Sequence, residues 1–222
     1  MTPRRDLIGT GRHPVVIVDD ASGKVPAIVD MAAALAPFPK GPNPHYPGVR
    51  RVIEESDPAA FGYVRDLLEG TAPFIAGGFD LDAFDLLEAS FSMVTAVPAT
   101  LTAAQRAPHF DSTDANYIAV LHYLTNTPGT AFYRQRSTGI EAVTPETYDR
   151  FVTTVRAEGA GDGYIVTDDE RFERIGSVEG KADRLVIYQG RLLHSGIIPA
   201  GAVLSADPRV GRLTTNIFIR GR

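Results

Sequence analysis

The chain has 222 residues and a formal net charge of −5, with 22 Lys and Arg against 27 Asp and Glu. A chain of this length buries roughly 70–75% of its unfolded surface, so a hydrophobic core can stabilise it without cross-links. It contains no cysteine, which excludes disulfides and thiolate metal sites. No block of Lys and Arg stands out, so we expect no nucleic-acid partner.

The sequence gives no sign of a membrane-targeting segment. Its N-terminal region contains one short apolar run, Val15 to Val18, which is shorter than the apolar core of a signal peptide. Nothing approaches the roughly 20 apolar residues of a membrane span. We therefore expect a cytoplasmic protein with no membrane partner, and the sequence does not indicate its oligomeric state.

The first half of the chain predicts two helices between short strands. Val15 to Val18 is typical of a buried strand, and apolar residues at helical spacing follow from residue 28 to residue 35. Five prolines between residues 37 and 47 predict a loop, which we expect to shape selectivity. A second amphipathic helix is predicted over residues 58–69, and a strand over residues 89–97.

The second half is richer in strands. Residues 116–124 and 130–133 are predicted strands, and the turn between them indicates a hairpin. Thr144 and Pro145 are typical of an N-cap and a first helical position, and Gly159 of a helix end. The apolar face of this helix would consist of Tyr148, Phe151, Val152 and Val155. Residues 185–188 and 213–219 are the last predicted strands.

Together these elements predict a mainly β protein with flanking helices. We expect one domain over residues 1–222, with a helical buttress over about residues 20–70 and a β core over about residues 89–220. No internal repeat or linker interrupts it.

The most informative residues are His109 and Asp111, in the stretch Pro108-His109-Phe110-Asp111. Side chains alternate along extended backbone, so an H-x-D pair points to one face. His194 follows a predicted strand and supplies a second imidazole. Two imidazoles and one carboxylate on one side of a metal form the facial triad of non-haem Fe(II) oxygenases. Arg212, at the start of the last strand, offers the cationic fork that a bound dicarboxylate needs, and Thr214 shares its face.

The motifs also resemble a known family. The stretch from Pro108 to Asp111, the strand ending in His122-Tyr123-Leu124-Thr125-Asn126 and the turn from Gly129 to Tyr133 are similar to the 2-oxoglutarate/Fe(II) oxygenase superfamily, prolyl-4-hydroxylase-like branch. Residues 182–194 resemble the strand that leads to that family's second iron histidine. Arg212-Leu213-Thr214 is similar to its R-x-S/T pair. Residues 15–36 and 46–50 look like the leading region of uncharacterised bacterial members.

This resemblance implies a double-stranded β-helix, a jelly-roll or cupin-like barrel. It further implies Fe(II) held by His109, Asp111 and His194, and 2-oxoglutarate held by Arg212 and Thr214. Two features depart from the family pattern. The interval between His194 and Arg212 is longer than usual, which a longer loop can absorb. The Gly-rich turn is reduced to Pro128-Gly129-Thr130.

Two pairs of residues, one of tyrosines and one of arginines, each allow two interpretations. Tyr117 and Tyr123 share a strand face, where they either bind 2-oxoglutarate or pack inside the barrel. Arg134 and Arg136 either bind a substrate carboxylate or are solvated hairpin charges. We expect His122 to pack outside the barrel, and we assign no function to His13 or His45.

The predicted function is an Fe(II)- and 2-oxoglutarate-dependent dioxygenase that hydroxylates an amino acid, a peptidyl residue or a small natural product with O₂. Asp111 favours hydroxylation over halogenation, because halogenases of this superfamily carry a small residue at that position. Two alternatives remain: a non-catalytic metal-binding or sensor barrel, and a cupin-type metalloenzyme without oxoglutarate.

Overall fold

A computed structural model describes residues 1–40 and 45–222 of the chain. Part of the predicted loop 37–47, and with it part of its expected role in selectivity, lies outside the described residues. The strands and helices in chain order are β1 (Thr2–Ile8), β2 (His13–Asp19), α1 (Val25–Ala34), β3 (Gly48–Val52), α2 (Pro58–Phe79), β4 (Phe84–Val94), β5 (Tyr117–Tyr123), β6 (Thr127–Gln135), α3 (Tyr148–Glu158), β7 (Phe172–Gly180), β8 (Arg184–Gln189), β9 (His194–Gly196) and β10 (Leu213–Gly221).

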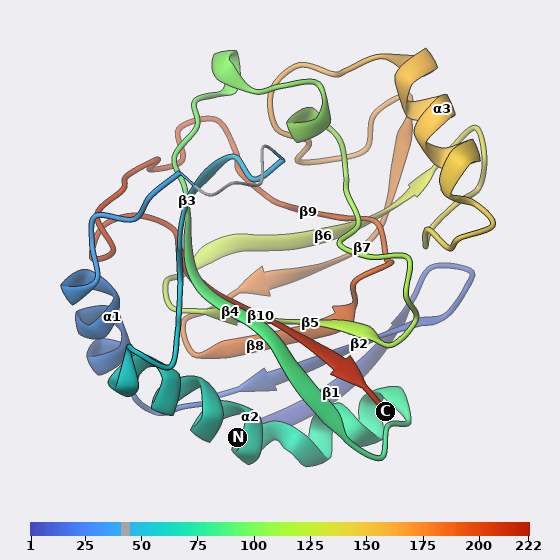
Figure 1. Ribbon diagram of the computed structural model, residues 1–222. Helices are drawn as coiled ribbons and strands as arrows, with labels where there is room; N and C mark the ends of the chain where they lie inside the picture. Colours follow the sequence, from blue (N-terminus) through green and yellow to red (C-terminus); the bar gives the residue numbers. More distant parts are fainter. Residues whose placement is uncertain (41–44) are drawn as a thin grey trace.

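Two antiparallel sheets face each other (Figure 1). The larger sheet has seven strands in the order β1-β2-β8-β5-β10-β4-β3, and the smaller has three in the order β7-β6-β9. Neighbours in each sheet are mostly distant in sequence, as in a jelly roll. The predicted fold class, a β barrel with flanking helices, is confirmed.

Helices α1 and α2 cover the outer face of the larger sheet (Figure 1). Ile28 of α1 and Val64 of α2 join a buried apolar cluster with outward residues of the central strands, such as Ile187 and Ile217. Burial of such side chains contributes about 1.5–3 kcal/mol each to the free energy of unfolding. The two helices therefore flank the outer face of the sheet, and the division into a helical buttress and a β core stays a prediction.

The inner face of the larger sheet has two unlike halves. On β2, β8 and β5 it is apolar, and Phe132 of β6 and Val178 of β7 pack against it. On β4 the inner positions are Ser90 and Ser92, which pair in register with β10 and β3. The polar half is the one that a ligand can use, since the apolar half is already filled by the smaller sheet.

Two predicted helix boundaries are wrong. Helix α2 continues ten residues past residue 69, through Pro73, to Phe79. Buried Thr71 and Ile75 hold these turns in place, and the Thr71 hydroxyl donates to the Leu67 carbonyl at 2.7 Å. Packing therefore outweighs the cost of proline inside a helix.

Helix α3 begins at Tyr148 with Thr147 as its N-cap residue, so the predicted cap at Thr144 is also wrong. Thr144 instead closes a preceding turn, because its carbonyl accepts the backbone N–H groups of Thr147 and Tyr148. Tyr148 is exposed, so the buried face of α3 is narrower than predicted. The predicted end at Gly159 is confirmed.

The predicted hairpin between β5 and β6 is wrong, because these strands belong to different sheets. The turn residues Thr127 to Gly129 lie within β6 itself. The segment thus crosses from one sheet to the other, and no local turn signal distinguishes this from a hairpin.

His122 lies on the outer face of β5, as predicted. Its Nδ1 lies 2.6 Å from the Tyr63 hydroxyl of α2, and its Nε2 lies 3.0 Å from Asp183 Oδ1. The ring is fully buried. The ring therefore fixes α2 to the outer face of the sheet and does not reach the inner face.

In the part of the chain that the structure describes, no helix is long and apolar enough to cross a membrane.

The turn between β1 and β2 is held by Glu141, a buried carboxylate. It accepts hydrogen bonds from the backbone of Thr10 and Gly11 and from Arg134, at 3.0, 3.0 and 2.9 Å. Burial alone would raise its pKa, but these hydrogen bonds outweigh burial and lower the pKa to about 2. The folded state is therefore stabilised at every pH where the carboxylate would be charged in the unfolded chain.

We predict that Glu141→Gln lowers the free energy of unfolding by about 3 kcal/mol at pH 7, because the folded pKa lies about two units below the unfolded value near 4.3. The difference from the wild type should persist above about pH 4.5 and shrink as the pH falls towards 2. Urea unfolding at several pH values measures it, with Glu69→Gln as the control, since Glu69 is 71% exposed. A deficit that does not depend on pH would contradict this account.

Candidate metal centre and ligand pocket

The two histidines are brought together by a reciprocal pair of backbone hydrogen bonds. His109 N–H donates to the His194 carbonyl and His194 N–H donates to the His109 carbonyl, both at 2.9 Å. Residues paired directly in this way point to the same face of an antiparallel pair. The ring centroids of His109 and His194 accordingly lie 4.3 Å apart.

Asp111 follows two residues later on extended backbone and so reaches the same face. Its N–H donates to the Gly190 carbonyl at 2.7 Å, which fixes the segment. Asp111 Oδ2 lies 3.6 Å from His194 Nε2, and Asp111 Oδ1 lies 3.9 Å from His109 Nε2. Potential ligand atoms from the three residues all lie within 4.8 Å of one another. The three predicted ligands therefore converge.

Close approach at this point depends on Gly190. A Cβ at this position would lie 2.6 Å from Tyr117 Cδ1 and 3.2 Å from Asp111 Cβ. A larger residue would push Asp111 or Tyr117 away from the cluster.

His194 is held in the form that binds metals. Its Nδ1 lies 2.8 Å from the Leu192 carbonyl, which can only accept, so Nδ1 carries the proton and Nε2 keeps its lone pair. Burial lowers the pKa of His194 to about 4, so the ring is neutral at pH 7. A neutral imidazole with a fixed tautomer is what a metal requires.

Asp111 is short of partners. Its Oδ2 is buried and has no hydrogen-bond partner, and burial raises the pKa of this carboxyl to about 6. A buried carboxylate without a donor is costly unless a cation compensates it. The free Nε2 of His194 faces the same atom, so these side chains fit a divalent metal with nitrogen and oxygen ligands, Fe(II) among them.

Arg212 immediately precedes β10 and lies beside β9. Its Nη2 donates to the Gly129 carbonyl at 3.4 Å, and its guanidinium carbon lies 5.6 Å from the centre of the Tyr123 ring. A Cβ on Gly196 would lie 3.4 Å from the same Nη2. The long interval from residue 197 to residue 211 therefore brings Arg212 back beside Gly196, which follows His194 by two residues in β9.

Three buried polar atoms around this pocket have no hydrogen-bond partner: Asp111 Oδ2, Arg212 Nε and the Tyr46 hydroxyl. Only one other side-chain atom of the described residues, Thr125 Oγ1, shares this state. The charge of Arg212 lowers the pKa of Tyr46, although burial raises it more. Buried polar groups are normally paired, so such a cluster indicates a place for a polar ligand.

Tyr188 lies between the metal ligands and Arg212. Its ring centroid is 4.8 Å from that of His194. Burial raises its pKa well above the ordinary value, Asp111 adds to the rise, and Arg212 opposes it. One side chain thus lies within the electrostatic range of both ends of the pocket.

Three further predicted residues lie on this inner face. The Tyr123 hydroxyl bonds to Thr130 at 2.5 Å, and the Thr214 hydroxyl donates to Asn216 at 2.9 Å. Tyr117 packs against Phe218, with a centroid separation of 5.3 Å, and lies next to Asp111. The hydroxyls of Tyr123 and Thr214 are thus engaged within the barrel, while their side chains still line it.

Arg134 and Arg136 pair with carboxylates of their own surroundings instead of joining the metal cluster. Arg134 bonds to Glu141 at 2.9 Å and lies 3.4 Å from Glu173. Arg136 bonds to Asp168 at 2.9 Å. Their predicted contact with a substrate carboxylate stays a prediction, and it would require one of these partners to be displaced.

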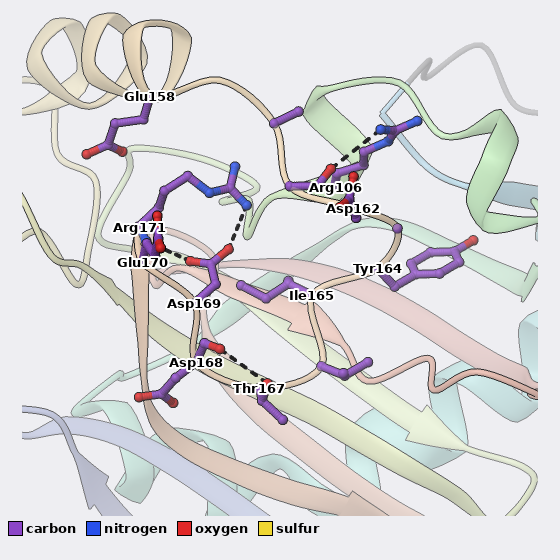
Figure 2. A pocket seen from close by; sticks show the side chains of 14 residues that line it. Arg106, Glu158, Asp162, Tyr164, Ile165, Thr167, Asp168, Asp169, Glu170 and Arg171 are labelled. Carbon is purple, nitrogen blue, oxygen red and sulfur yellow. Dashed lines mark hydrogen bonds and ion pairs between the residues drawn. The ribbon is translucent and has the colours of Figure 1, made fainter.

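A separate hollow lies along the segment between α3 and β7, lined by residues 158–171 and Arg106 (Figure 2). Its charged side chains are largely satisfied locally, as Arg171 pairs with Asp169 at 2.6 Å and Arg106 donates to the Gly161 carbonyl at 3.4 Å. Tyr164 points away from this group in Figure 2, and its hydroxyl donates to the Ala96 carbonyl at 2.7 Å. Burial raises the pKa of Tyr164 to about 12, and Tyr46 and Arg212 also influence it. The residues that line the hollow do not include His109, Asp111 or His194.

Three residues near the candidate site were not predicted from the sequence: Tyr46, Arg50 and Tyr188. Arg50 and Gly48 lie on one face of β3 while Val49 lies in the outer core. The segment Gly48 to Val52 has no regular polar-apolar alternation, because Arg50 and Arg51 are adjacent, so the sequence carried no clear signal for Arg50. Tyr188 carried no such signal, because an aromatic residue in a buried strand is ordinary.

Comparisons with known proteins agree with the geometry. The chain belongs to the family described as "Family of unknown function (DUF6445)", whose model matches residues 1–219. No curated protein matches it in sequence. Among solved structures it is similar to the non-heme alpha ketoglutarate dependent epimerase SnoN from nogalamycin biosynthesis, with a TM-score of 0.55 and 13% identity over 95% of this chain and 79% of that one.

It is also similar to HygX from Streptomyces hygroscopicus, solved with nickel and 2-oxoglutarate bound, with a TM-score of 0.54 and 13% identity over 93% of this chain and 82% of that one. At such identity the likeness establishes the fold. The resemblance to the 2-oxoglutarate/Fe(II) oxygenase superfamily is thus confirmed in its architecture, the double-stranded β-helix.

We predict that alanine at His109, Asp111 or His194 weakens binding of Fe(II) or Mn(II) by more than about 100-fold, because loss of a ligand costs more than the loss of its outer support. Anaerobic titration calorimetry measures the affinity, and circular dichroism checks folding. His13→Gln, which changes a histidine outside the cluster, is the control. Near-wild-type metal affinity in a double variant of His109 and His194 would overturn this assignment.

Proposed function

We propose that the protein is an Fe(II)- and 2-oxoglutarate-dependent oxygenase that hydroxylates a small molecule or an amino-acid residue, with residues 1–222 acting as one catalytic domain. The observation that carries this proposal is the gathering of unpartnered atoms in one pocket. Asp111 Oδ2 has no hydrogen-bond partner at one end of the site, and Arg212 Nε and the Tyr46 hydroxyl have none at the other. A metal-bound dicarboxylate would satisfy all three atoms.

His109, Asp111 and His194 would hold the metal on one side and leave the opposite side to ligands. When bound, Fe(II) and 2-oxoglutarate supply the activation of O₂ that protein side chains cannot perform. The protein's own contribution is to keep both imidazoles neutral and correctly oriented. Burial keeps His194 neutral, the Leu192 carbonyl fixes its tautomer and orientation, and the backbone pair fixes the position of His109.

Arg212 would pair with the distal carboxylate of 2-oxoglutarate. A guanidinium can form two parallel hydrogen bonds with a carboxylate, and Nε is one of its donors. The Tyr46 hydroxyl would add a third donor from another element. Tyr123 and Tyr188 form buried aromatic walls that exclude water, which strengthens these charged hydrogen bonds.

Asp111 supports hydroxylation as the reaction. When a metal is bound, its carboxylate would occupy the coordination position that a halide needs in a halogenating relative. The known structures give independent support for the cofactors, since SnoN is described as alpha ketoglutarate dependent and HygX was solved with nickel and 2-oxoglutarate.

We expect Arg212→Ala to weaken 2-oxoglutarate binding by about 2–4 kcal/mol, roughly 30- to 1000-fold, because it removes one partner of a buried charged pair. Metal affinity should remain within about threefold of the wild type, since no metal ligand changes. Titration calorimetry with the Mn(II) form measures both. Arg209→Ala is the matched control, because Arg209 lies in the same connection and its side chain is 57% exposed. Unchanged 2-oxoglutarate affinity would place the anchor elsewhere.

The reaction itself is tested by turnover. With Fe(II) and O₂, the wild type should convert 2-oxoglutarate to succinate slowly alone and faster with a substrate, whose product should carry one oxygen atom from ¹⁸O₂. Asp111→Asn should reduce this turnover by about 100-fold or more through loss of a charged ligand, whereas Asp114→Asn should retain it. Tight 2-oxoglutarate binding without succinate under any condition would favour a binding or sensor protein. Metal-dependent turnover without 2-oxoglutarate would favour a cupin-type metalloenzyme.

A further inference from the structure

An ion pair on the polar half of the inner face is not used by the metal or by the 2-oxoglutarate anchor. Arg50 of β3 donates from Nη2 to Glu88 Oε1 at 2.6 Å and to the Ser90 hydroxyl at 2.8 Å. Its Nε donates to the Ser92 hydroxyl at 3.4 Å. Both serines are fully buried, so the guanidinium is seated against β4 in one orientation.

The pair is linked to the metal cluster by contacts along the inner face: Glu88 is in register with Phe218 of β10, Phe218 packs against Tyr117, and Tyr117 and Asp111 both lie against Gly190. Arg50 lies close enough to Asp111 for its charge to oppose the rise in the pKa of that carboxyl. Glu88 and Arg50 both act on the pKa of Tyr117, which burial and Asp111 raise. Tyr117 is also the neighbour of Asp111 across Gly190. Arg50, Glu88 and Tyr117 thus line the side of the pocket that adjoins Asp111.

The pair retains unused binding capacity. None of the hydrogen bonds above uses Nη1 of Arg50 or Oε2 of Glu88. The Glu88 side chain is 40% exposed and that of Arg50 is 13% exposed, so the pair is open on one side. It therefore presents a donor and an acceptor of opposite charge next to each other.

We propose that Arg50 and Glu88 form the substrate subsite and select a free α-amino acid, with Arg50 binding the carboxylate and Glu88 binding the ammonium group. This inference rests on the proposed function, since it names the substrate class of that same site. Tyr117 and Phe218, whose rings lie 5.3 Å apart, form the apolar wall beside the subsite.

Charge balance favours a zwitterion over a singly charged substrate, and the free donor and acceptor of the pair favour it over a neutral one. The charges of a ferrous ion, Asp111, 2-oxoglutarate and Arg212 cancel, and those of Arg50 and Glu88 cancel as well. An anionic substrate would have to compete with Glu88 for Arg50, and a cationic one would compete with Arg50 for Glu88. A zwitterion pairs with both groups and leaves no buried charge uncompensated.

The first experiment measures substrate dependence and binding in parallel. The common L-α-amino acids are tested singly for succinate release above the background of the Fe(II) enzyme with 2-oxoglutarate alone. Their binding to the protein is measured separately by ligand-observed NMR, which does not require turnover. At least one amino acid should bind and raise succinate release, and its N-acetyl and amide derivatives should do neither.

The second experiment assigns the two charges. Arg50→Gln and Glu88→Gln should each raise the KM for that amino acid by about 10- to 100-fold, because each removes one charged hydrogen bond. The affinity of Glu88→Gln for 2-oxoglutarate should stay near wild type, whereas Arg50→Gln is judged by its KM, because the charge of Arg50 also acts on Asp111. Arg51→Gln is the matched control, since the neighbouring Arg51 pairs with Asp57 on the other face of β3 and should leave the KM unchanged.

The outcomes are distinguishable. If no amino acid binds or stimulates a protein that still binds 2-oxoglutarate and releases succinate, the subsite proposal is wrong and the proposed function stands. Equal response to blocked derivatives also overturns it and indicates a peptidyl substrate. If Arg50→Gln lowers the melting temperature but leaves the KM unchanged, the pair only stabilises the contact between β3 and β4, and the subsite proposal is wrong. A protein that binds no 2-oxoglutarate at all fails at the proposed function instead.

Discussion

The site depends on the reciprocal backbone hydrogen bonds between His109 and His194, 2.9 Å each. These two bonds join a segment outside the named strands to β9, and they force both imidazoles onto one face. The alternation of extended backbone then places Asp111 beside them. No side-chain interaction is needed to assemble the three groups, so they can remain unpaired and ready for a metal. The unpartnered Asp111 oxygen is the consequence.

The two halves of the inner face of the larger sheet have different roles: one forms the core of the barrel and the other carries polar side chains. Packing of the smaller sheet against β2, β8 and β5 fills the apolar half and gives the barrel its core. The polar half, on β10, β4 and β3, stays available and carries Arg50 with its two supporting serines. Two buried tyrosines lie at the border of the two halves: Tyr188 packs against His194 and Tyr123 against Arg212.

Much of this arrangement could be predicted from the sequence, for identifiable reasons. His109 and Asp111 could be predicted because the alternation of side chains along a strand depends only on neighbouring residues. His194 and Arg212 could be predicted because each adjoins a strongly apolar strand. Tyr46 and Arg50 could not, since their role comes from β3 pairing with β4, a contact between segments about 40 residues apart. The β5–β6 connection was misread as a hairpin, because a turn sequence does not encode which sheet receives the next strand. The edge strand β1 was missed because its exposed, charged residues carry no apolar pattern.

The central claim is that one pocket holds a metal at His109, Asp111 and His194 and a 2-oxoglutarate carboxylate at Arg212. A crystal structure of the protein grown anaerobically with Mn(II) and 2-oxoglutarate tests it most directly. The account predicts anomalous density within ligand distance of the three side chains and continuous ligand density from the metal to Arg212 and Tyr46. Metal density at other residues, or 2-oxoglutarate density that does not reach Arg212, would contradict it.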